Sequence, residues 1–115
     1  MYHVYQIVSL KESCKEKKQA WREVLFDGAE GYKPELMEFY DHVADVDATN
    51  LDQIFMIMNR WEPSDEALVT RHAPLHSLSV GDVLIDSKTG QASMVNPCGF
   101  AEIKFNKLER HYETV

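Results

Sequence analysis

Cysteine is scarce in this chain, and long apolar runs are missing. Its 115 residues include two cysteines, Cys14 and Cys98, which are too few and too widely spaced for a disulfide framework, so we expect free thiols. No apolar run approaches the roughly 18 residues that a membrane-spanning helix needs. The first eight residues (MYHVYQIV) lack the basic and apolar regions of a signal peptide. We therefore expect a cytoplasmic protein without a membrane segment.

Basic residues are in short supply as well. Lys and Arg number 12 against 19 Asp and Glu, which gives a net charge of −7. Because Lys and Arg supply most of the affinity for phosphates, this balance argues against nucleic acid as the main ligand and against an anionic membrane surface. The chain also lacks the GxxxxGK[ST], GxGxxG and HExxH motifs. Its length and its hydrophobic content of 44% suit one domain, residues 1–115, with a single core.

The acidic residues are concentrated in the middle of the chain. Residues 1–22 carry five basic and two acidic side chains, whereas residues 23–70 carry twelve acidic ones against Lys33 and Arg60, a balance of −10. An acidic surface steers basic partners, and it can also mimic nucleic acid. We expect this segment to bind a basic surface of another protein. The candidate binding residues, with one aromatic anchor, are Glu35, Glu38, Asp41, Asp45, Asp47, Asp52 and Trp61.

The N-terminal half predicts a strand, a helix and a further strand. Residues 2–9 are rich in β-branched and aromatic side chains, as strands are. Residues 12–26 have helical periodicity, with Val24 beside a face of four residues: Cys14, Lys18, Trp21 and Leu25. Residues 36–46 fit both alternation and a helical period, and we favour the strand.

The clearest helix is expected after residue 48. Thr49 or Asn50 can cap it, and the apolar residues that follow have the i, i+3, i+4, i+7 spacing of one helix face. These residues are Leu51, Ile54, Phe55 and Met58. Residues 61–76 are expected to form a long loop with one short helical turn near residues 64–69.

The C-terminal third predicts a β-meander. Strands are expected over residues 83–85, 91–96 and 100–105, separated by turns at residues 87–90 and 97–99. The whole is an α+β fold, in which a small antiparallel sheet of this meander and the N-terminal strand packs with two helices on one face.

Three segments carry a resemblance to a known family. They are residues 51–60 (LDQIFMIMNR), residues 76–84 (HSLSVGDVL) and residues 99–103 (GFAEI). This pattern resembles the YodL-like domains common on bacterial mobile elements and phages, over residues 50–104 and the N-terminal strand. The resemblance implies no settled enzymatic activity. It implies a small accessory domain of phage or plasmid origin. Together with the acidic segment and the absence of a catalytic set of residues, the resemblance leads us to expect a non-enzymatic protein that binds and modulates a host protein in the bacterial cytoplasm.

The family-like motifs have a structural reason of their own. Ser77 and Ser79 share one side of an extended segment, and Gly81 with Asp82 makes a turn where the next strand starts. The carboxylate of Asp82 can cap nearby backbone N–H groups. In the segment 99–103, we expect a positive φ at Gly99 and the start of a strand at Phe100.

The histidines do not predict a metal site. His72 and His76 have a spacing that binds metal on a helix, with Cys98 as a conceivable third ligand, but Pro74 interrupts a helix there. The sequence therefore predicts no metal and no cofactor. The remaining histidines are scattered and are expected to lie at the surface or to be partly packed: His3, His42 and His111.

Two other function classes stay open. A small nucleic-acid-binding module could use the basic helix from Lys11 to Arg22 and residues 77–82 (SLSVGD), where the VGDV sequence is weakly similar to PUA and ASCH barrels. A small enzyme could use Cys98 as nucleophile with His76 as base. We favour the protein-binding interpretation, and we name no catalytic residue.

Overall fold

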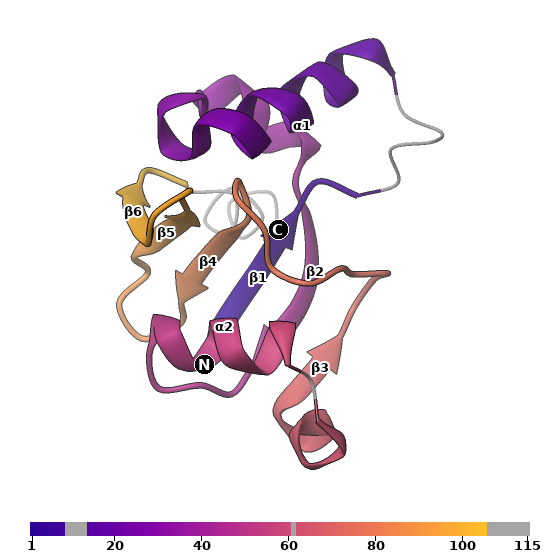
Figure 1. The fold of residues 1–115 in the computed structure, drawn as a ribbon, viewed down its shortest axis with the longest axis vertical. Helices are drawn as coiled ribbons and strands as arrows, with labels where there is room; N and C mark the ends of the chain where they lie inside the picture. The colour runs from indigo at the N-terminus through magenta and orange to yellow at the C-terminus, as the bar shows by residue number, and fades with distance from the viewer. Residues whose placement is uncertain (9–13, 61, 106–115) are drawn as a thin grey trace, which may run out of the picture.

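The computed structural model describes residues 1–8, 14–60 and 62–105. Their core is a six-stranded antiparallel sheet of order β3-β2-β1-β4-β5-β6 (Figure 1). Its strands are β1 (Tyr2–Gln6), β2 (Asp41–Val46), β3 (Val69–Arg71), β4 (Val83–Asp86), β5 (Ala92–Val95) and β6 (Phe100–Ile103). The N-terminal strand lies inside the sheet, between β2 and β4, and joins the C-terminal meander as expected. The small antiparallel α+β fold predicted from the sequence is confirmed.

Both faces of the sheet are covered, because strand residues alternate between two cores. Along β4, Val83 and Ile85 face one core and Leu84 faces the other. Helix α2 (Leu51–Asn59) covers the Leu84 side, and α1 (Lys15–Asp27) covers the Val83 side. The prediction of helices on one face is therefore wrong. The error arose because helical periodicity gives the width of a buried face but not the side of the sheet it covers.

Three short 3₁₀ helices connect these elements: η2 (Gly28–Glu30), η3 (Pro34–Phe39) and η4 (Pro63–Leu68). Of these, η4 is the helical turn expected near residues 64–69. The predicted cap of α2 is also confirmed, because the Asn50 side chain accepts a hydrogen bond of 2.8 Å from the backbone N–H of Gln53. None of the described helices has the length and apolar character to cross a membrane.

Two expectations for the first half need correction. Helix α1 begins at Lys15 and buries Ala20 and Val24, whereas Cys14 precedes it and is exposed; residues 9–13 lie outside the described residues. Residues 36–46 are not one strand. Residues 36–39 belong to η3, and β2 starts at Asp41. The mixed periodicity of this segment reflects two elements in succession, and Pro34 favours the helical start.

The segment expected to be a long loop contains a strand. β3 forms the edge of the sheet, and its three residues pair with Ala44, Asp45 and Val46 of β2. A three-residue strand is too short to show alternation in the sequence. Through this pairing, the chain just after β3 is held beside the middle of β2, which brings His72 to the site described next.

Candidate functional site

Three histidines, from β1, from β2 and from the residue after β3, converge on one carboxylate. His3 Nδ1 lies 2.5 Å and His42 Nε2 lies 2.7 Å from Asp45 Oδ1, and His72 Nε2 lies 2.7 Å from Asp45 Oδ2. Each imidazole donates to the carboxylate, so Asp45 accepts three hydrogen bonds. We call these four residues the histidine cluster. His3 and His42 are partly packed, as expected, but the sequence did not predict that they meet at one carboxylate.

Sheet register builds the histidine cluster. His3 and Asp45 are direct partners across β1 and β2. Each of the two lies between residues of the α2-side core, so alternation turns both toward the other face. His72 follows β3, and its backbone N–H donates to the carbonyl of Val43 at 2.8 Å. The ring of His42 is stacked on Tyr5, with the ring centres 4.9 Å apart.

The surroundings of Asp45 favour its ionised form. Burial alone would raise the pKa of its carboxyl, but hydrogen bonds from His3, His72 and His42 and the charge of His42 outweigh burial and lower it to about 2. The side chains remain partly accessible, with 18% of His3 and 19% of Asp45 exposed. The Asp45 carboxylate is thus an anionic group that solvent can reach and that imidazole nitrogens surround.

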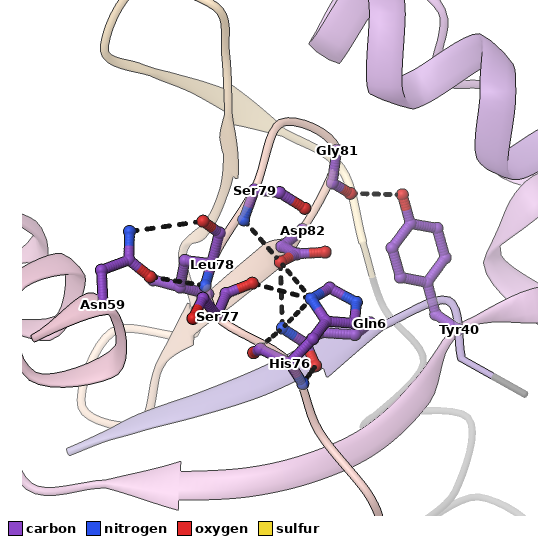
Figure 2. A network of polar contacts seen from close by, with 9 residues as sticks. All are labelled: Gln6, Tyr40, Asn59, His76, Ser77, Leu78, Ser79, Gly81 and Asp82. Atoms are coloured by element: carbon purple, nitrogen blue, oxygen red, sulfur yellow. Dashed lines mark hydrogen bonds and ion pairs between the residues drawn. The ribbon is translucent and has the colours of Figure 1, made fainter. Parts of the chain in front are cut away.

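A second polar cluster joins Gln6 of β1 to residues 76–82 (HSLSVGD; Figure 2). The Asp82 carboxylate accepts hydrogen bonds from Gln6 Nε2 at 3.0 Å and from the backbone N–H of Ser79 at 2.9 Å. Gln6 also donates to the carbonyl of His76 and accepts from its N–H, at 2.9 and 3.1 Å. Asp82 therefore caps the backbone as the sequence suggests, and Gln6 ties the loop to β1.

The pKa of Asp82 is shifted in the opposite direction from that of Asp45. Burial raises its pKa to about 7, although the nearby His76 and the hydrogen bonds from Ser79 and Gln6 oppose the rise. His76 Nδ1 is 3.9 Å from Asp82 Oδ2 and donates to the carbonyl of Ser77 at 2.7 Å. A buried carboxyl beside a histidine is typical of functional sites, but here every partner holds the loop in place.

Neighbouring elements clamp the same loop. Asn59, at the end of α2, accepts from the N–H of Leu78 at 2.7 Å and donates to its carbonyl at 3.3 Å (Figure 2). The Tyr40 hydroxyl donates to the carbonyl of Gly81 at 2.6 Å, and burial raises the pKa of this phenol. The SLSVGD segment is thus fastened to β1, α2 and the start of β2.

The sequence-predicted acidic residues fall into separate groups. Glu35, Glu38 and Asp41 are exposed on η3 and at the start of β2. Asp47 is exposed beyond the other end of that strand, about 20 Å from Asp41 at the usual rise per residue, and Asp52 is exposed on α2. Asp45 lies between them in the histidine cluster, and Trp61 lies outside the described residues.

An apolar groove opens between α2 and the turn from β5 to β6. It has a volume of about 650 Å³. Phe55 and Met56 of α2 line it and are 38% and 57% exposed, unusually high for large apolar side chains. Phe100 forms the opposite wall, with its ring centre 6.3 Å from that of Phe55. One predicted acidic residue, Asp52, is among the lining side chains.

The groove was missed because helix periodicity places Phe55 in the core. In the structure, Ile54, Ile57 and Met58 are the buried residues of α2, and Phe55 lies at the margin of that face. Consecutive apolar residues at 54–58 are the available signal, because one helix face cannot bury all of them.

The residues of the alternative metal site and of the alternative enzyme, His72, His76 and Cys98, do not converge on one site. His72 faces Asp45, whereas His76 lies by Asp82, so the pair does not share one ligand position. Cys98 is an exposed free thiol in the turn before β6. Within the described ranges, the side chains whose ligand atoms lie close enough to hold a metal ion are His3, His42 and Asp45. Neither Cys98 nor His76 is among them.

Comparisons with protein-family models, with curated proteins and with solved structures returned no match for this chain.

Proposed function

We propose that this chain is a non-enzymatic binding protein, whose groove between α2 and the β5–β6 turn takes a basic segment with one apolar face from a partner protein. The single observation that carries the proposal is the apolar groove of about 650 Å³, with Phe55 and Met56 left in solvent. Contiguous exposed apolar surface of this kind marks interaction sites on soluble domains.

The apolar part of the groove supplies the anchor points. Phe55 and Phe100 meet edge to face, which leaves ring surface available to an entering side chain. Met56 is flexible and adapts to irregular apolar shapes. A partner with two or three apolar side chains on one helical face would gain free energy by filling this space.

Charge selects a basic partner over an acidic one. Among the described residues that line the groove, Asp52 is the charged one, and neither Lys nor Arg occurs there. Asp47 is exposed four residues before α2 begins. The whole chain carries a net charge of −7. Lys or Arg side chains flanking an apolar segment would therefore be attracted to this side of the molecule.

The finer identity of the partner follows from the resemblance. The YodL-like segments at residues 51–60, 76–84 and 99–103 include α2 and the wall of the groove. A mobile-element accessory protein acts on its host. We therefore propose a bacterial host protein with a basic surface as partner, met in the cytoplasm.

Designed amphipathic peptides test the proposal. Fluorescence anisotropy would follow a labelled Leu/Lys helix and its Leu/Glu counterpart as the protein is added. We expect the cationic peptide to bind in preference, and Phe55→Ala to weaken that binding at least about fivefold. Asp52→Asn should weaken it less, and the effect of Asp52 should shrink as salt is raised.

The matched control is Phe26→Ala. Phe26 is 73% exposed on α1 and does not line the groove, so this variant makes the same substitution at an exposed phenylalanine elsewhere. It should leave the affinity unchanged. Equal losses in Phe26→Ala and Phe55→Ala, or a preference for the anionic peptide, would contradict the proposal.

A further inference from the structure

The histidine cluster has the ligand atoms of a transition-metal site. His3 Nδ1 or Nε2, a ring nitrogen of His42 and a carboxylate oxygen of Asp45 all lie within 4.8 Å of one another. In a tetrahedral zinc site with bonds of about 2.0–2.1 Å, ligand atoms are roughly 3.3 Å apart. Small rotations of these side chains would open that spacing, with the ion in the place of the shared protons.

We propose that His3, His42 and Asp45 bind one divalent transition-metal ion of the zinc class, and that His72 is a positioning residue for Asp45. Two imidazole nitrogens with one carboxylate oxygen suit Zn²⁺ and Co²⁺, whereas Ca²⁺ and Mg²⁺ prefer all-oxygen sites. Three protein ligands leave a coordination position open for water or a partner's side chain.

The scaffold is suited to hold such a site. All three ligands project from β1 and β2, which are adjacent strands in the interior of the sheet, and His3 and Asp45 are partners in the ladder. Tyr5 stacks on the His42 ring and restrains it. Side chains on strands are placed more precisely than side chains on loops.

His72 completes the surroundings from the third strand. Its Nε2 donates to Asp45 Oδ2 and leaves Oδ1, the oxygen shared by His3 and His42, for the ion. A hydrogen bond that orients a ligating carboxylate in this way tightens metal binding. Exposures of 18% for His3 and 32% for His42 leave an entry path for a hydrated ion.

Cobalt titration tests the site directly. Co²⁺ added to the full chain should produce visible d–d bands that saturate at one equivalent, and Zn²⁺ should abolish them. Asp45→Asn and His42→Gln should each weaken binding at least about tenfold. His72→Gln should weaken it less than either, and adding back the metal in excess should restore the bands.

Matched controls lie close by in the chain. Asp47→Asn removes an exposed carboxylate two residues from Asp45, and His76→Gln removes a histidine outside the histidine cluster. Both should bind Co²⁺ as the unsubstituted protein does. Absence of the bands, a stoichiometry above one, or equal losses in these controls would overturn the proposal.

A measurement on the unsubstituted protein removes any dependence on folding of the variants. Long-range ¹H–¹⁵N spectra resolve the ring nitrogens of each histidine. Added Zn²⁺ should shift one ring nitrogen of His3 and one of His42 to metal-bound values, with His76 unmoved. A spectrum in which His3 and His42 keep their shifts would show that the histidine cluster is a hydrogen-bonded network without an ion.

Discussion

Asp45 and Asp82 both lie beside histidines, yet their pKa values move apart. Asp45 accepts three imidazole hydrogen bonds and keeps contact with solvent, so its charge is stabilised. Asp82 is 4% exposed and has one histidine at 3.9 Å, too far for a hydrogen bond, so burial dominates. The number of direct donors and the degree of burial decide which way the pKa of each carboxyl moves.

The raised pKa of Asp82 has a consequence for stability. Unfolding returns this pKa from about 7 to near its usual 3.8, so between these pH values the folded state holds a proton that the unfolded state has lost. The free energy of unfolding should therefore fall as pH rises through this window. Asp82→Asn cannot ionise, and we expect it to gain about 2 kcal/mol relative to the unsubstituted chain between pH 5 and pH 8.

Urea denaturation of both proteins at several pH values measures this difference. Asp47→Asn, which removes an exposed carboxylate, serves as the control and should run parallel to the unsubstituted protein. A stability difference between Asp82→Asn and the unsubstituted chain that stays constant from pH 5 to pH 8 would show that Asp82 is ionised throughout.

At the scale of elements, the SLSVGD loop depends on a close approach to α1. Gly81 has a φ of +97°, and a Cβ built there would lie 2.7 Å from Val24 Cγ2. Gly99 has a similar φ of +81°, but nothing lies within 4 Å of its Cβ position. Both glycines have a positive φ, which alanine would adopt only with strain, and they differ in the space available for a Cβ.

Alanine substitutions separate these two effects. Gly99→Ala should cost about 1 kcal/mol of the free energy of unfolding through strain alone, whereas Gly81→Ala should cost about 3 kcal/mol because α1 must also move. Chemical denaturation gives both values. Equal costs would mean that the added Cβ fits beside Val24 without a displacement of α1.

The elements were predictable where local signals decide them. Asn50, the apolar spacing of α2 and the turns of the meander each follow from residues a few positions apart. The strand β3 could not be predicted in this way, and neither could the side of the sheet that each helix covers, because both depend on pairing with distant strands. The same limit applies to the SLSVGD loop, whose capping by Asp82 was foreseeable but whose tie to Gln6 was not.

At the scale of the whole molecule, the two proposed sites lie on opposite faces of the sheet. The groove borders the α2-side core through Leu78, Val95 and Phe100. The histidine cluster faces the other side, beside Tyr5 of the α1-side core. A ligand at one site therefore leaves the other open.

The sequence alone could not predict where in the fold the groove or the histidine cluster lies. His3 and Asp45 are 42 residues apart, and only the register of β1 on β2 brings them together. The acidic segment predicted a partner of opposite charge, but β2 spreads its carboxylates over both ends of a strand. Sequence spacing identifies local groups, whereas sheet order decides which distant groups meet.

The most direct measurement is a map of amide chemical shifts as the cationic amphipathic peptide is added to the ¹⁵N-labelled chain. We predict that the shifts concentrate in α2, residues 78–80 and residues 95–100, and that the amides of β2 and β3 stay in place. Shifts confined to the basic side of α1 or to η3, or the absence of shifts at saturating peptide, would contradict the proposed groove.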